Sequence, residues 1–170
     1  PVKESLFEVR ARSDASFQEL LMYGFYGGDG EAGNYTTYTG SRRQLQMVMK
    51  SLELEYDPMK GIVVVGLDIS DNGSNMPHSM KPAVGASVKN LSGVSSADGF
   101  IYRGMKPVFG TEIVEGGSSF VTFANVQVSE EVSVSVSPPD NMECALGPAG
   151  VGGAKANYAS VAVTKDVISV

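Results

Sequence analysis

The chain has 170 residues, a length for which one domain with one core is expected, so we predict a single domain over residues 1–170. Its 13 basic and 19 acidic residues give a net charge of −6, and the basic residues are scattered. This balance excludes a nucleic-acid-binding arm and disfavours docking on an anionic membrane. With 19% charged residues and 20 glycines, the composition favours strands joined by turns over amphipathic helices.

The first elements along the chain are expected to be a strand and a short helix. Residues 5–12 alternate apolar and charged side chains, which is the period of a half-buried strand. A capping-box pattern at residues 16–19 and an apolar stripe over residues 17–21 predict a short helix. This helix must end by Gly24, because the glycine-rich residues 27–34 are typical of a loop.

The segment Arg43–Tyr56 fits a strand and a helix almost equally well. Alternate residues from Leu45 to Met49 are apolar, as in a strand, but the apolar residues of the segment also recur at the spacing of one helical face. We favour a strand with a bulge at residues 50–51, and the alternative is a helix capped by Ser41.

From residue 62 onward the chain is expected to form short strands separated by turns. The apolar run at residues 62–67 is typical of a strand buried on both faces. In residues 132–136 each valine is separated by a serine, which predicts one packed face and one face open to solvent or to a partner strand. Further strands are expected at residues 83–88, 100–102, 107–114, 120–128, 158–163 and 167–170.

These elements predict an all-β fold, namely a single-domain β-sandwich with eight to ten strands and one or two short helices. The long connections at residues 24–34, 70–82 and 138–156 favour a jelly-roll or Greek-key arrangement, in which strands cross between sheets.

Few residues are suited to catalysis or metal binding. His78 is the single histidine and Cys144 the single cysteine, so we expect no catalytic triad, no structural zinc site and no internal disulfide. The oxygen-bearing side chains between Asp68 and Gly73 resemble the start of a calcium loop, but Ser79 stands where such a loop requires glutamate. We therefore expect no enzyme activity, no cofactor and no metal; a pair of carboxylates brought together by the fold is the open alternative.

Four tyrosines lie close to the glycine-rich loop in the sequence. A cluster of this kind commonly fills an interface or the edge of a core, and a ligand-binding or carbohydrate-binding face is the alternative. The candidate binding surface consists of Tyr23, Tyr26, Tyr35 and Tyr38.

The low charge, the abundance of glycine and serine and the lack of catalytic groups lead us to expect a non-enzymatic structural protein that forms symmetric homo-oligomers. This profile resembles that of viral single jelly-roll proteins, which are capsid, spike or capsid-decorating components. The N-terminus lacks the layout of a secretory signal and no internal disulfide can form, so we expect a protein made in the cytoplasm. The resemblance implies that it becomes part of a virion and has itself and other shell proteins as partners. The alternative is a ligand-binding or carbohydrate-binding β-sandwich module for host attachment or recognition.

Overall fold

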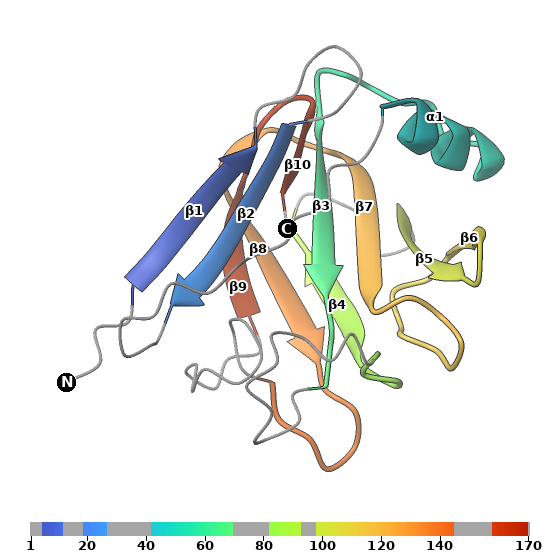
Figure 1. Ribbon diagram of the computed structural model, residues 1–170, viewed down its shortest axis with the longest axis vertical. Helices are drawn as coiled ribbons and strands as arrows, with labels where there is room; N and C mark the ends of the chain where they lie inside the picture. The colour runs from blue at the N-terminus through green and yellow to red at the C-terminus, as the bar shows by residue number, and fades with distance from the viewer. Residues whose placement is uncertain are drawn as a thin grey trace.

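The fold was analysed in a computed structural model. It describes residues 5–11, 19–26, 42–69, 82–92, 98–144 and 158–169. Within these ranges the chain forms ten strands and one helix, arranged as an all-β sandwich (Figure 1). The predicted fold class, an all-β sandwich with few helices, is therefore confirmed. The elements are β1 (Ser5–Ala11), β2 (Glu19–Tyr26), α1 (Arg42–Ser51), β3 (Gly61–Gly66), β4 (Ser87–Leu91), β5 (Gly99–Arg103), β6 (Lys106–Phe109), β7 (Phe120–Val126), β8 (Ser129–Ser137), β9 (Tyr158–Val163) and β10 (Val167–Ser169).

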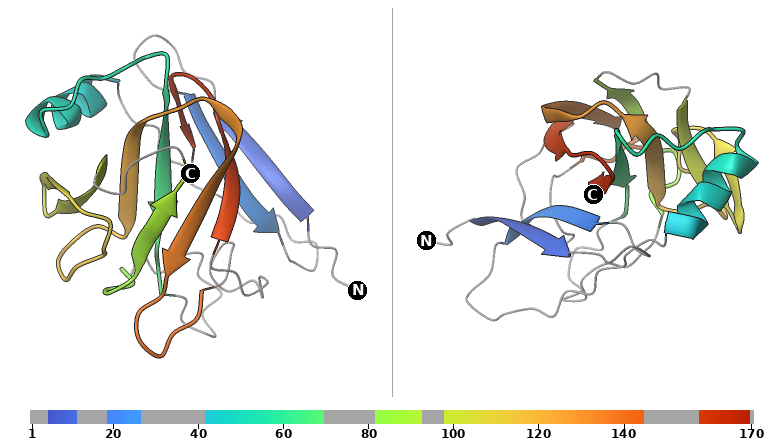
Figure 2. Two further views of the ribbon diagram at one scale, coloured as in Figure 1. Left: turned by 180° about the vertical axis from the view of Figure 1, so that it is seen from behind. Right: turned by 90° about the horizontal axis from the view of Figure 1, so that it is seen from above.

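The strands form two sheets. The larger sheet has the order β1-β2-β10-β3-β7-β5-β6, and the smaller one has the order β4-β8-β9. Figure 2 shows the smaller sheet in front of the larger one when the molecule is seen from behind. β10 runs parallel to both of its neighbours, β2 and β3. Because a jelly roll is built from antiparallel neighbours, the jelly-roll form of the sandwich is not confirmed.

The main core lies between the two sheets. Val63 and Phe123 contribute from the larger sheet, and Val132 and Val134 contribute from β8 in the smaller one. Val132 and Val134 are buried and Val136 is half-buried against the core, whereas Ser133 is exposed, which confirms the alternation predicted for this strand.

One side of the sandwich is closed by the residues that follow β6. The chain turns at Gly110, whose φ of 155° is readily adopted by glycine. It then pairs with the smaller sheet: the Val88 N–H donates to the Thr111 carbonyl at 2.9 Å, and the Ile113 N–H donates to the Ala86 carbonyl at 2.8 Å. The strand predicted at residues 107–114 is thus divided between the two sheets.

The segment Arg43–Tyr56 begins as a helix, so the strand that we favoured there is wrong. Met49 and Leu52 are buried against Phe100 on the outer face of the larger sheet, whereas Met47 is 62% exposed. A strand would have placed Met47 and Met49 on the same packed face. The alternative that we considered, a helix, is the observed one; its proposed cap, Ser41, lies outside the described residues.

α1 ends in a Schellman motif in which glutamate occupies the usual glycine position. The Glu53 N–H donates to the Lys50 carbonyl at 3.1 Å, and the Leu54 N–H donates to the Met49 carbonyl at 2.8 Å. Glu53 has a φ of 58°, the left-handed conformation that glycine adopts at least cost. The usual sequence signal for a helix end is therefore missing.

Glu53→Gly should raise the free energy of unfolding by about 0.5–1 kcal/mol, because glycine relieves the left-handed conformation by more than it adds to unfolded-chain entropy. Urea unfolding measures this change. The control is Glu55→Gly: Glu55 has no positive φ, so glycine there should lower the stability. A loss of stability in the Glu53 variant would contradict the expectation.

The prediction of a helix over residues 17–21 is wrong at residues 19–21. Residues 19–21 belong to β2, which pairs antiparallel with β1 and parallel with β10. Pairing on both sides outweighs the local helical pattern, and the strand continues through Gly24 to Tyr26. Residues 16–18 lie outside the described residues.

Candidate functional site

The structure does not describe the side chains of the four tyrosines of the candidate binding surface. Tyr23 and Tyr26 lie in β2, but for these two the structure describes the backbone alone. Tyr35 and Tyr38 lie outside the described residues. The tyrosine surface therefore stays a prediction.

Of the other residues considered in the sequence, Asp68 and Cys144 are described. Asp68 forms an isolated β-bridge with Pro82 just after β3, while most of the calcium-like stretch, residues 70–73, and His78 lie outside the described residues. Cys144 is half-buried, and this burial raises the pKa of its thiol. Among the residues described, no group of three or more His, Cys, Asp or Glu side chains could hold a metal ion. The described part of the chain also contains no helix long and apolar enough to cross a membrane.

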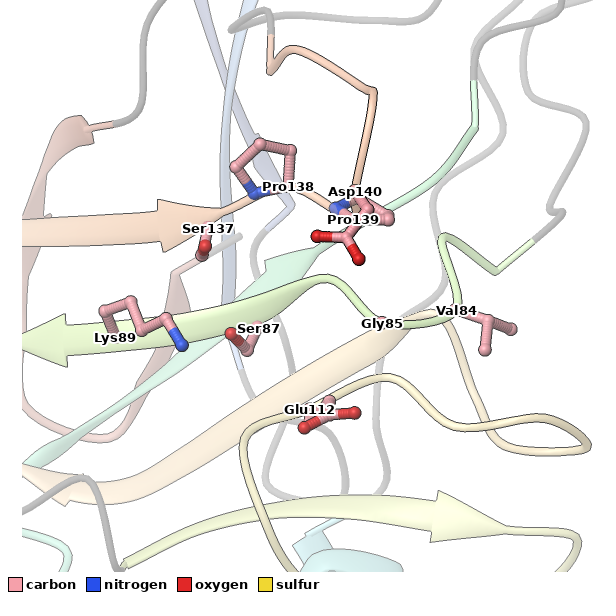
Figure 3. A pocket seen from close by; sticks show the side chains of 9 residues that line it. All are labelled: Val84, Gly85, Ser87, Lys89, Glu112, Ser137, Pro138, Pro139 and Asp140. Atoms are coloured by element: carbon pink, nitrogen blue, oxygen red, sulfur yellow. The ribbon is translucent and has the colours of Figure 1, made fainter.

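A polar pocket of about 470 Å³ lies where β4 begins and β8 ends (Figure 3). Ser87 and Lys89 come from β4, and Ser137 is the last residue of β8. The lining residues are Val84, Gly85, Ser87, Lys89, Glu112, Ser137, Pro138, Pro139 and Asp140. These side chains offer hydroxyl, ammonium and carboxylate groups for hydrogen bonding.

The charged groups of the pocket lie on different walls. Figure 3 shows the Lys89 amine directed along β4 towards Ser87, with Glu112 and Asp140 on separate segments. Lys89, Glu112 and Asp140 are all exposed, so water screens their charges. The pocket is therefore an open polar hollow rather than a desolvated site for acid–base chemistry.

A second feature is a group of apolar side chains on α1 and the β5–β6 hairpin that are exposed or half-buried; we call it the helix–hairpin surface and define it by Met47, Tyr102, Met105, Pro107 and Phe109. In the β5–β6 hairpin, Phe109 is opposite Phe100 and Pro107 is opposite Tyr102. Residues directly opposite each other in an antiparallel pair share one face of the sheet. Phe109, Pro107, Tyr102 and Phe100 therefore lie together on the outer face of the larger sheet.

α1 covers part of this outer face and leaves the rest open. Phe100 is 1% exposed beneath α1, whereas Phe109, beside it on the edge strand, is 50% exposed. Met105, in the turn between β5 and β6, is 94% exposed, and Met47 lies on the solvent side of α1. Figure 1 shows α1 and the β5–β6 hairpin on the same side of the molecule, where β5 and β6 end the larger sheet.

Polar and charged residues frame the helix–hairpin surface. Arg43 and Lys50 are exposed one helical turn before and one after Met47, so they flank it on the outside of α1. Lys106 is exposed on β6, and Glu115 is exposed in a turn next to the hairpin. This turn is held to the hairpin by the Gly104 N–H, which donates to the Gly116 carbonyl. An apolar centre with a charged rim of both signs is the usual composition of a protein interface.

Tyr102 forms the inner edge of the surface. Its ring meets that of Phe100 edge-on, with centroids 6.2 Å apart and an interplanar angle of 71°. Burial raises the pKa of the Tyr102 hydroxyl, so the group is neutral at physiological pH and adds no charge to the apolar surface.

Asn125 holds the segment after α1 against the sheet. Gly61 is opposite Val126 and Val63 is opposite Phe123, so β7 has one residue more than β3 at this point, which is a β-bulge. Asn125, in this bulge, has a φ of 55°. Its Oδ1 accepts from the Asp57 N–H at 3.0 Å, and its Nδ2 donates to the Glu55 carbonyl at 2.7 Å.

A second contact fixes the same segment to the turn between β9 and β10. The Tyr56 hydroxyl donates to Oδ1 of Asp166, and the Asp166 N–H donates to the Lys60 carbonyl at 2.8 Å. The residues after α1 are therefore bound to a strand, β7, and to a turn, both of which are distant in the sequence. These contacts position α1, and with it the helix–hairpin surface.

The helix–hairpin surface was not among the sites predicted from the sequence. Its signal was the count of eight methionines, which include Met47 and Met105. Alternation predicts which residues share a face, but not which part of that face a helix leaves uncovered.

The fold and this surface together define a β-sandwich with an exposed, methionine-containing apolar surface beside its described helix. No protein-family model, no curated protein and no solved structure matches the chain.

Proposed function

We propose that the protein is a non-enzymatic assembly protein, a capsid, spike or capsid-decorating component of a virion, that forms symmetric homo-oligomers and contacts other shell proteins. The observation that carries this proposal is the exposure of Met105 and Phe109 on the β5–β6 hairpin, together with that of Met47 on the solvent side of α1. Apolar side chains grouped in this way, with a polar rim, mark sites of association between proteins.

The chemistry of the surface suits contact with another protein. Full burial of a methionine or phenylalanine side chain contributes about 1.5–3 kcal/mol, so a few such residues account for much of an interface. Methionine also adapts its shape to a partner, because its side chain is unbranched and polarizable. The rigid support from Asn125 and Asp166 means that little ordering is needed when a partner binds.

Met105→Lys and Phe109→Lys should each shift the protein towards the monomer, because a charge would have to be buried in the contact. Size-exclusion chromatography with light scattering over a range of concentrations measures the mass. The matched control is Met142→Lys: Met142 is 45% exposed, but it follows β8 rather than lying at the hairpin, and this change should leave the mass unaltered.

A wild-type chain that keeps the monomer mass at all concentrations and does not bind purified particles would overturn the assembly proposal. The virion assignment is tested separately by genomic neighbourhood: portal, terminase or tail genes beside the coding sequence would support it. A coding sequence surrounded by metabolic genes would contradict it.

A further inference from the structure

The outermost strand of the larger sheet, β1, has an outer edge that is suited to pairing. β1 has seven residues and contains no proline. Within the described parts of the chain its ladder partner is β2, on one side. Figures 1 and 2 show β1 at the outer side of the sheet. A strand in this position presents a row of backbone N–H and C=O groups that can bond to another strand.

Two other edges of the sandwich, those of β6 and β4, are protected. β6, at the opposite end of the larger sheet, has four residues and includes Lys106 and Pro107, both of which discourage strand pairing. The edge of β4 that faces away from β8 is bonded to residues 111–113. β1 contains neither proline nor lysine, and no segment within the described residues pairs with its outer edge.

We infer that β1 pairs antiparallel with β1 of a second copy, so that the larger sheets of two subunits join across a two-fold axis at Val9. This inference rests on the proposed assembly function and identifies one of its contacts. It is separate from the helix–hairpin surface, which lies at the other end of the larger sheet.

The charge pattern of β1 selects this register. Glu8 and Arg10 are two residues apart, so they occupy the same face of the strand. Antiparallel pairing centred on Val9 places Glu8 of each copy opposite Arg10 of the other, which makes two complementary pairs. Sliding by two residues places Glu8 opposite Glu8 or Arg10 opposite Arg10, and like charges directly opposite each other are destabilising.

Charge reversal tests this register. Glu8→Arg and Arg10→Glu should each raise the dimer dissociation constant, by about tenfold, because two attractive pairs become repulsive. The double variant, with both changes, restores complementary pairs and should dimerise like the wild-type chain. Sedimentation velocity measures the association, and circular dichroism confirms that each variant is folded.

Cross-linking provides a second measurement that does not depend on charge. In a Cys144→Ser background, Val9→Cys should give a covalent dimer under mild oxidation, since opposite residues of an antiparallel pair are within disulfide reach. Phe7→Cys is the control: the two copies of residue 7 would lie about 13 Å apart, four residues along the strand, which is too far to bridge.

The outcomes separate this contact from the proposed function. Weakened single variants, recovery in the double variant and a Val9-specific cross-link would support the β1 contact. An oligomeric wild-type chain whose charge variants associate normally, or whose Val9 and Phe7 variants cross-link equally, would overturn the β1 contact alone. A strictly monomeric wild-type chain would overturn the β1 contact, and one that also failed to bind purified particles would overturn the assembly proposal.

Discussion

Gly99→Ala should lower the free energy of unfolding by about 2 kcal/mol, because a Cβ at this position has no space and overpacking of a core typically costs 1–3 kcal/mol. An ideal Cβ on Gly99 would lie 2.7 Å from Cγ2 of Thr111 and 2.8 Å from Cε1 of Phe123. Phe123 is fully buried in the core between the sheets, so its ring has little room to move. Chemical denaturation followed by circular dichroism measures the loss.

Gly66→Ala, in another strand of the same sheet, is the matched control. A Cβ there would meet the Phe120 ring at 3.4 Å, which is an ordinary contact, and Gly66 has no positive φ. This change should therefore alter stability by less than about 0.5 kcal/mol. Adding Thr111→Ser to Gly99→Ala removes the nearest atom and should recover part of the loss. Equal effects of the two glycine substitutions would contradict the steric explanation.

Asn125→Ala should lower the free energy of unfolding by about 2 kcal/mol, since it removes two hydrogen bonds and leaves alanine in a left-handed conformation. The lost bonds join Asn125 to the Asp57 N–H and the Glu55 carbonyl, which hold the segment after α1. Backbone amides of α1 should also exchange faster with solvent, because the helix is then less firmly tied to the sheet.

Asn125→Gly separates the two contributions to this effect. Glycine loses the same hydrogen bonds but adopts the φ of 55° without strain, so its loss should be smaller, about 1 kcal/mol. If the alanine and glycine variants were equally stable, backbone strain at the bulge would play no part. If glycine left the stability unchanged, the two side-chain hydrogen bonds would contribute nothing.

Alternation in the sequence was sufficient to predict several strands of the sandwich. β8 is the clearest case, because Val132 and Val134 must both face the core once the strand is formed. β1, β3 and β9 also lie where their apolar patterns indicated. β4 is Ser87–Leu91 rather than residues 83–88, because residues 83–86 instead form a turn stabilised by the Ala86 N–H, which donates to the Ala83 carbonyl at 2.9 Å.

The errors arise where distant contacts outweigh local patterns. The first turn of the predicted N-terminal helix had suitable capping residues, yet residues 19–21 pair with β1 and β10, and β10 is far away in the sequence. At α1 the alternation of Leu45, Met47 and Met49 favoured a strand, and Glu53, which stands where helices commonly end in glycine, gives no local signal of the helix end. The helix–hairpin surface depends on where α1 lies over the sheet, which Asn125 and Asp166 determine through contacts that no local pattern reveals.

The position of β10 also has a consequence for the order in which the protein forms during translation. The β1–β2 hairpin joins the rest of the larger sheet through β10, which lies between β2 and β3 and is the last strand in chain order. The ribosome therefore releases the hairpin long before the strand that connects it to β3. Before β10 is synthesised, β3 of the nascent chain can already pair with β7. The β1–β2 hairpin cannot yet join the sheet, so its strands stay exposed and can be bound by chaperones.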